Sequence, residues 1–207
     1  KCLEGNSGPY NIIPQFKMFH KELGVDEPVV LDVEVLEESA NKLYDNDIIL
    51  QYYIKSNNKP LPGKGNGEKI DILNIKKFSA LAEIPDWRRK LDNTYDNTFE
   101  LDGHKWKTVE HYYQANKFKN TNKEFYLLFS LDSDSKISKD VELAKAAGSK
   151  TGKLKSGLLR SKDIKIDPEF YGGIDETVLE NGLYAKFSQN DDLKDMLLKT
   201  LNAKLLH

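Results

Sequence analysis

The segment FELDGHKWKTVEHYYQANKF, residues 99–118, predicts a β-hairpin that leads directly into a helix. The Asp102-Gly103 pair is typical of a tight turn between two antiparallel strands. Thr108 is a suitable N-cap, and the helix that it starts is expected to reach about Phe118. These signals place a small hairpin at the entrance to a mainly helical region.

One face of this helix carries Glu110, Gln114 and Lys117, at positions i, i+4 and i+7. A carboxylate and an amine a turn or two apart can do acid–base work, and the amine can also attack a carbonyl to form a Schiff base. The same pattern is common on a solvated helix face. Spacing therefore leaves both interpretations open, with Glu110 and Lys117 as candidate catalytic residues and Gln114 as a candidate ligand contact.

The rest of the chain predicts an α+β fold that is mostly helical and carries a small hairpin or sheet. We expect an irregular arm at 1–28, strands at 29–36 and 47–56, and a glycine-rich loop at 59–68. A last helix is expected to start at Asp191. Its apolar residues lie at helical spacing and form core or an interface: Leu193, Met196, Leu197, Leu201 and Leu205. The whole chain, residues 1–207, has a length that suits one domain.

Composition limits the possible functions. The net charge of -2 argues against an electrostatic grip on nucleic acid by the whole protein, but it allows a local basic patch. Cys2 is the only cysteine, which excludes an intrachain disulfide and fits a reducing, intracellular compartment. The histidines lack metal-binding spacing, and no apolar run reaches the roughly 18 residues that a membrane span requires. We expect a monomer without metal, cofactor or membrane contact.

A glycine-rich loop, GKGNGE at residues 63–68, resembles a phosphate cradle. Glycines let backbone N–H groups approach an anion closely, and a lysine adds charge. The loop has neither the Walker A spacing nor a surrounding βαβ unit, and a plain surface turn is the competing interpretation. Its candidate substrate-binding residues are Gly63, Lys64, Gly65, Gly67 and Glu68.

A basic stretch follows a helix that is expected from Ser138 to Ala147 and to end at Gly148. Its basic residues are Lys150, Lys153, Lys155, Arg160, Lys162 and Lys165, against Asp163 alone. Such a stretch is usually a solvated loop, but directly after a helix end it can hold a diphosphate, with Lys150 as the candidate. Trp87, Tyr112 and Tyr171 are candidates for stacking on a base, although core packing is the commoner role of such aromatics.

Several motifs occur together in a fixed order. They are Leu91-Asp92-Asn93, FELDGHKW, TVEHYYQANKF, AKAAG, AKFSQN and LLKT. In this combination the chain resembles the NADAR family, which is linked to NAD and ADP-ribose and is also called YbiA-like. The resemblance covers roughly residues 70–207 and implies a YbiA-like α+β fold.

The resemblance also implies a function. Members are similar to N-glycosidases that cut a base-to-ribose bond. Some act on ribosylaminopyrimidine intermediates of riboflavin synthesis, and others remove ADP-ribose from guanine in nucleic acid, for which a lysine Schiff base has been proposed. The family's catalytic glutamate corresponds to Glu110, its helix lysine to Lys117 and its turn asparagine to Asn93, with Lys64 as an alternative nucleophile.

The chain departs from the family pattern in three places. No arginine follows Gly148, Phe170-Tyr171 stands where a tryptophan is usual, and the C-terminal W-G-D and glycine-rich segment is missing. We expect the GKGNGE loop to take the place of that segment. These departures favour ADP-ribose or ADP-ribosylated nucleic acid as substrate. A glycosidase of riboflavin intermediates, a non-catalytic module that binds ADP-ribose or NAD, and an interaction domain that uses the C-terminal leucines are the alternatives.

Overall fold

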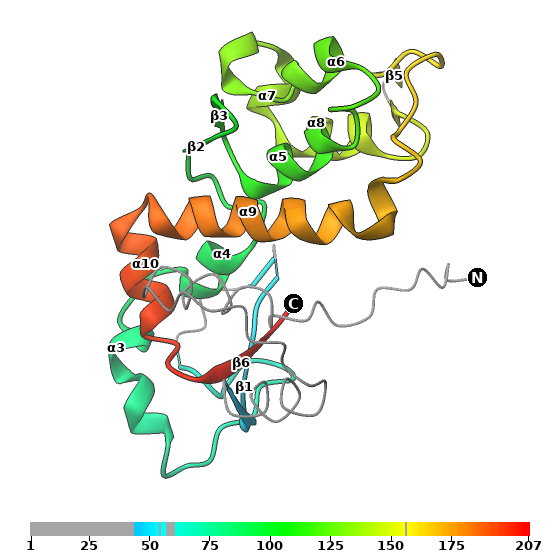
Figure 1. Cartoon of the computed structure of the whole chain (residues 1–207). Coiled ribbons are helices and arrows are strands. Elements are labelled where there is room, and N and C mark those ends of the chain that lie inside the picture. Colours follow the sequence, from blue (N-terminus) through cyan, green and yellow to red (C-terminus); the bar gives the residue numbers. More distant parts are fainter. Residues whose placement is uncertain (1–43, 54, 57–60, 156) are drawn as a thin grey trace, which may run out of the picture. The chain divides into compact units, whose positions relative to one another are not determined.

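The computed structural model describes residues 44–53, 55–56, 61–155 and 157–207 (Figure 1). The arm and the first strand that the sequence predicts lie outside these residues. The chain forms two compact units. The terminal unit combines Lys1–Arg89 with Met196–His207, and the central unit comprises Lys90–Asp195.

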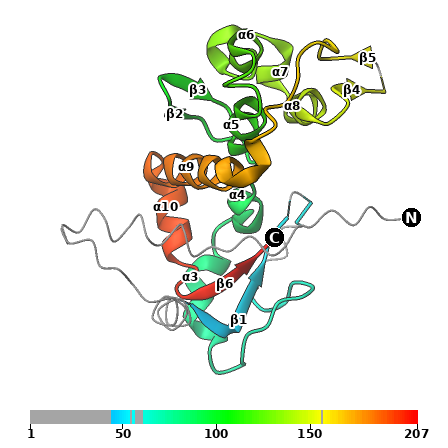
Figure 2. The same cartoon turned by 45° about the vertical axis from the view of Figure 1, so that its right-hand side comes forward.

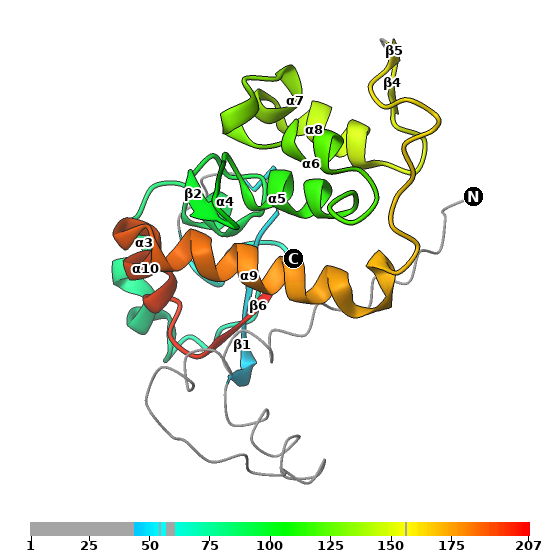
Figure 3. The same cartoon turned by 45° about the horizontal axis from the view of Figure 1, so that its top comes forward.

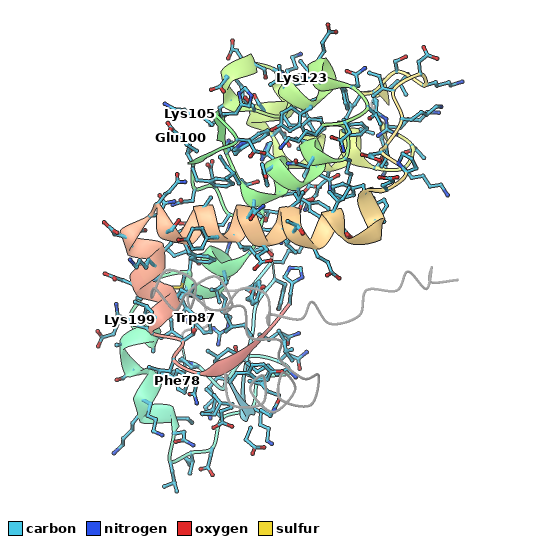
Figure 4. The ribbon with its side chains drawn as sticks, viewed as in Figure 1. Phe78, Trp87, Glu100, Lys105, Lys123 and Lys199 are labelled. Atoms are coloured by element: carbon cyan, nitrogen blue, oxygen red, sulfur yellow. The ribbon has the colours of Figure 1, made fainter. Side chains whose placement is uncertain are left out.

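The central unit contains the predicted β-hairpin, which is confirmed. Strand β2 (Phe99–Leu101) pairs antiparallel with β3 (His104–Trp106). Asp102 and Gly103 both have positive φ, 54° and 74°, as the two central residues of a type I′ turn require. Figure 4 shows Glu100 and Lys105 projecting from the two strands, where Lys105 Nζ lies 3.5 Å from Glu100 Oε1.

Helices make up most of the remaining central unit. They are α5 (Val109–Asn116), α6 (Lys123–Leu127), η2 (Leu131–Ser133), α7 (Lys136–Lys139), α8 (Val141–Gly148), the π-helix η3 (Phe170–Ile174) and α9 (Asp175–Ser188). A two-residue hairpin of β4 (Lys153–Leu154) and β5 (Gly157–Leu158) lies in the predicted basic loop. Helix α5 lies between α8 and α9 (Figures 1 and 3). This arrangement makes α5 the centre of the unit.

Helix α5 is placed by its cap and by its neighbours. Thr108 has extended backbone, and its side chain accepts a hydrogen bond from the His111 amide, so the predicted N-cap is confirmed. Gly182 lets α9 approach closely, because a Cβ there would lie 3.1 Å from a Tyr112 ring carbon and 3.2 Å from a Val109 methyl. The core around α5 is aromatic and includes Phe99, Trp106, Phe118, Phe125, Phe129 and Phe170.

The helix that the sequence predicts to start at Ser138 is two helices instead. Ser135 caps α7, and Asp140 caps α8 by accepting hydrogen bonds from the amides of Glu142 and Leu143. Asp140 has φ -130° and ψ 118°, which is extended backbone, so the helical hydrogen-bond ladder breaks there. The helix ends close to the predicted place, but Gly148 is its last helical residue and Ser149 is the C-cap, so Gly148 is not the left-handed glycine beyond the helix end that the sequence predicts.

The terminal unit holds a small parallel sheet. Strand β1 (Asp45–Gln51) pairs with β6 (Ala203–Leu206), as Figure 2 shows. The unit also contains the 3-10 helix η1 (Ile75–Phe78) and α3 (Ser79–Ala82), whereas α4 (Trp87–Leu91) and α10 (Asp191–Leu198) cross the boundary between the units.

The end of the chain corrects one prediction. Helix α10 starts at Asp191 as expected but ends at Leu198, and Leu205 lies in β6 rather than on a helical stripe. Leu201 has φ 52°, a left-handed conformation that cannot continue a helix.

The fold is therefore α+β, largely helical with small sheets, as the sequence predicts. Within the described residues, no helix has the length and apolar character that crossing a membrane requires.

Candidate active site

The start of α5 carries a half-buried carboxylate, that of Glu110. Gln114 lies one turn later, and its Nε2 donates to Glu110 Oε1 at 2.8 Å. A carboxylate in the first helical turn is stabilised by the helix dipole, and the amide restrains its orientation. The Glu110 carboxylate is thus held in place from its own helix.

A close contact between α5 and α8 fixes Gln114 in turn. A Cβ added at Gly148 would lie 2.0 Å from Gln114 Oε1, so a larger residue here requires Gln114 or α8 to shift. Gln114 is 8% exposed, and its Oε1 atom is buried without a hydrogen-bond partner among the described residues. A buried amide oxygen without a partner is costly and points to a place where a donor can bind.

Lys117 follows the last residue of α5 and turns inward. It is 6% exposed, and its Nζ donates to the carbonyl oxygen of Gly148 at 3.3 Å. The ammonium faces aromatic rings, with Nζ at 5.2 Å from the ring centre of Tyr113, 5.6 Å from Tyr171 and 6.0 Å from Phe170. A lysine that is buried to this degree is poorly solvated, which favours the neutral amine, whereas the ring faces favour the ammonium.

Burial lowers the pKa of Lys117 from its ordinary value to about 8. The negative charge of Glu110 opposes this shift, the positive charge of Arg160 reinforces it, and the charge of Asp175 opposes it. An amine with a pKa near 8 is partly neutral at physiological pH and can act as a nucleophile. The Glu110 carboxylate therefore lies close enough to Lys117 for its negative charge to favour the protonated amine.

Arg160 is a buried cation beside this pair. It is 7% exposed and donates to the carbonyl oxygens of Ala147 and Lys150, at 2.9 and 3.1 Å. Its guanidinium lies 5.0 Å from the ring centre of Phe118. The arginine that usually follows the glycine in the family pattern is absent after Gly148. Arg160, which follows the β4–β5 hairpin in the chain, supplies a guanidinium at the same end of α8.

The turn that contains Asn93 lies against the first turn of α5. The Glu110 amide donates to the Asn93 carbonyl at 2.9 Å, and the Asn93 Oδ1 atom is buried without a partner within the described part of the chain. The structure thus brings Asn93, Glu110, Gln114 and Lys117 together. These four were all singled out from the sequence.

The remaining aromatic and basic candidates divide by exposure. Tyr112 is 2% exposed in the core, where its hydroxyl donates to Asp102, and Trp87 is 1% exposed inside the terminal unit, where Figure 4 labels it. Neither presents an open ring face for stacking. Tyr171 is 60% exposed, and the Lys150 side chain is exposed while its carbonyl binds Arg160.

The glycine-rich loop in the terminal unit is folded around its own glutamate. Glu68 Oε2 accepts from the amides of Gly63 and Gly65, at 2.8 and 2.9 Å, and the Gln51 amide donates to Oε1. Arg88 completes the cage with bonds of 2.9 and 2.8 Å to the two oxygens. Burial raises the pKa of Glu68, but the hydrogen bonds from Arg88 and Gly65 outweigh it and leave the pKa below its ordinary value.

The hydrogen bonds around Glu68 determine which groups of the loop remain available to bind a ligand. The Gly63 and Gly65 amides are engaged by a carboxylate, and a Cβ at Gly67 would lie 2.5 Å from Gln51 Oε1. A cavity of about 150 Å³ lies beside the loop, and Lys64, Asn66 and Arg88 are among the residues that line it.

Sequence reasoning missed two residues of the central site as site residues. Arg160 is the one arginine in the lysine-rich stretch of residues 150–165, and no residue near it in the sequence indicates that its side chain is buried. For Gly148 the sequence predicts only a helix end. Its close approach to Gln114 depends on how α8 packs against α5, which the sequence does not reveal.

A family model and two curated proteins that are similar to this chain point to the same family. A model of the NADAR domain matches residues 74–207. Two proteins named N-glycosidase YbiA, from Shigella flexneri serotype 5b (strain 8401) and from Shigella flexneri, are each 31% identical over 107 residues, which cover 52% of this chain and 54% of theirs. The chain thus spans about half the length of these curated relatives.

Among solved structures, an NMR structure of the E. coli protein YbiA is similar to this chain, with a TM-score of 0.43 and 22% sequence identity. The match covers 77% of this chain and 66% of that one. The NADAR model, in contrast, covers well over half of the chain and all of the residues that converge around Glu110 and Lys117. This chain belongs to the NADAR domain family.

Proposed function

We propose that this protein is an N-glycosidase that cleaves a base–ribose bond, and that it removes ADP-ribose from guanine in nucleic acid. The observation that carries the proposal is the pair formed by a restrained Glu110 carboxylate and a buried Lys117 amine with a pKa of about 8. The Shigella relatives are named N-glycosidases, which supports the reaction class.

In the proposed reaction, a proton reaches the ribose ring oxygen, the ring opens, and a C=N bond remains between C1 and the base. Glu110 handles this proton or stabilises the positive charge that develops at C1. The neutral Lys117 amine adds to C1, and the bond from C1 to the base breaks as the base takes a proton. Water then adds to the lysine imine, which releases the amine and leaves C1 as an aldehyde that closes to the ring. One water is consumed in total.

A polymeric anion as substrate is supported by the segment that follows α8. Five lysines there are exposed and form no ion pair within the described residues: Lys150, Lys153, Lys155, Lys162 and Lys165. Arg160 anchors this segment to the end of α8, next to the Gly148 carbonyl that binds Lys117. Exposed lysines near a site attract a phosphate backbone at low salt.

The test uses an oligonucleotide that carries one ADP-ribosylated guanine. Release of ADP-ribose is followed by chromatography, and borohydride is added to a parallel sample to trap the imine. We expect a lysine adduct at Lys117 by mass spectrometry. Glu110→Gln should lower the rate by about 100-fold or more, since it removes a group that acts only in the transition state.

Helix α8 offers a matched control. Glu142 occupies the same position in its helix as Glu110, two residues after the cap, and Lys145 follows one turn later, but both side chains are more exposed. Glu142→Gln and Lys145→Met should leave the rate unchanged. Full activity of Glu110→Gln would refute the catalytic assignment. Turnover of ribosylaminopyrimidine phosphate, without release from the oligonucleotide, would keep the glycosidase and reject the substrate.

A further inference from the structure

A second buried lysine lies against the turn that contains Asn93. Lys186 of α9 is 1% exposed, and its Nζ donates to the carbonyl oxygen of Asp92 at 2.8 Å. This is its one hydrogen bond among the described residues, where it forms no ion pair. The rings of Tyr95 and Phe187 flank the amine, with their centres at 5.8 and 5.0 Å.

Burial lowers the pKa of Lys186 to about 7, and the charge of Asp92 opposes that shift. A buried lysine costs stability, and an apolar side chain of similar volume usually packs as well or better. Packing alone therefore does not account for a lysine at this position. The amine differs from an apolar side chain in that it donates a hydrogen bond to one carbonyl of the turn, that of Asp92.

The turn is held at two consecutive carbonyls by donors from two different helices, α9 and α5. Lys186 binds the carbonyl of Asp92, and the Glu110 amide binds the next carbonyl, that of Asn93, at 2.9 Å. Asp92 also closes the turn locally, because its Oδ1 accepts from the Thr94 amide and hydroxyl, at 2.8 and 2.5 Å. The turn is thus a rigid link between α9 and the first turn of α5.

We propose that Lys186 is a positioning residue which, by holding the carbonyl of Asp92, sets the place of Asn93 and of the helix turn that carries Glu110. Lys186 itself is too enclosed to touch a substrate. The link to α5 runs through the Asn93 carbonyl, and the side-chain oxygen of Asn93 beside it is buried without a partner in the described part of the chain. The kinetic consequence rests on the proposed function, but the structural one does not.

The experiment measures hydrogen exchange of single backbone amides by NMR in the full chain. In Lys186→Met, which keeps the volume and removes the donor, the Glu110 amide should exchange about 10-fold faster, because its acceptor turn is loosened. The His111 amide, which is bound by the Thr108 side chain, should change by less than about 3-fold. On the oligonucleotide substrate, kcat should fall about 10-fold while KM stays within about 2-fold.

Gln189 provides the control, because it also ties the end of α9 to another segment. Its side chain forms two hydrogen bonds with the backbone of Glu100, at 2.8 and 2.7 Å, and therefore binds β2 rather than the carbonyls of the turn. Gln189→Ala should therefore leave the Glu110 amide and kcat as in the wild type.

An unchanged Glu110 amide in folded Lys186→Met would overturn the proposal. If that variant does not fold, Lys186→Gln keeps a polar group that is too short to reach Asp92, and the same faster exchange is expected. Unfolding of both variants would also count against the proposal, since it would show a global role rather than a local tether. A protein without glycosidase activity would remove only the kinetic readout, because the exchange measurement stands alone.

Discussion

Gly148→Ala probes the contact between α8 and the candidate active site. The new methyl group would lie 2.0 Å from Gln114 Oε1 and 2.8 Å from its Cδ. Non-bonded carbon atoms prefer about 3.5 Å or more, so a shift on the order of 1 Å is required. Rotation of Gln114, with loss of its 2.8 Å hydrogen bond to Glu110, would relieve these two contacts, but its Cβ would still lie 2.9 Å from the new methyl group, so α8 must also shift away from α5.

The expected cost follows from these two effects. Overpacking of this kind costs about 1–3 kcal/mol, and the better helix propensity of alanine returns about 1 kcal/mol. A net loss of about 1 kcal/mol corresponds to about 2–4 °C in Tm for a chain of this size. The effect on catalysis should be larger, about 10–100-fold in kcat, because a displacement of about 1 Å in a positioning group can cost that much.

The assay combines thermal unfolding with kcat for the single variants and for the double variant Gln114→Ala/Gly148→Ala. Removing the glutamine amide relieves the contacts at 2.0 and 2.8 Å, but the Cβ of residue 114 would still lie 2.9 Å from the new methyl group. Gly148→Ala should therefore cost less stability in the Gln114→Ala background than in the wild type, and the double variant should remain slow. Gly172→Ala is the control, since a Cβ there would meet nothing within 4 Å. Wild-type stability and kcat in Gly148→Ala would refute the close approach and, with it, the role of Gln114 in holding Glu110.

The charges of individual side chains lead to four further predictions. The rate of borohydride trapping at Lys117 should rise about 50-fold from pH 6 to pH 8 and level off above, because only the neutral amine adds to C1 and its pKa is about 8. In Asp175→Asn this profile should move to lower pH, since the Asp175 carboxylate raises the pKa of Lys117, and a move to higher pH would contradict the assignment. Replacing Lys153 and Lys155 by glutamine should reduce the slope of log affinity against log salt for a single-stranded oligonucleotide by about 1.4, and an unchanged slope would separate the basic segment from nucleic acid. Glu68→Gln should cost the terminal unit about 3–5 kcal/mol in urea unfolding, because it leaves a buried guanidinium without its carboxylate.

The elements around the site could be predicted from residues close to them in the sequence. The Asp102-Gly103 turn and the Thr108 cap are each decided by residues within a few positions. The contacts between elements were not foreseeable in this way. The partner of β1 is β6 at the other end of the chain, and a parallel pairing of two short segments leaves no turn sequence between them to reveal it.

The same distinction applies within the site. Spacing placed Glu110 and Lys117 on one face, which is a local property of a helix. The depressed pKa of Lys117 depends on burial against α8 and on Arg160, which comes 43 residues later in the chain (160 minus 117). Sequence therefore supplies the chemical groups, whereas packing decides whether the amine is a solvated cation or a nucleophile.

The glycine-rich loop shows why a motif alone does not identify its ligand. Closely spaced glycine amides bind an anion, and the sequence does not say whether that anion is a phosphate or a side chain. In the structure Glu68, from the loop itself, receives the Gly63 and Gly65 amides, and Arg88 neutralises its charge. A phosphate at these amides would have to displace a carboxylate that accepts five hydrogen bonds. Lys64 is exposed beside the cavity and has no such competitor within the described residues, so an anion that approaches this loop should be bound by the lysine rather than by the amides.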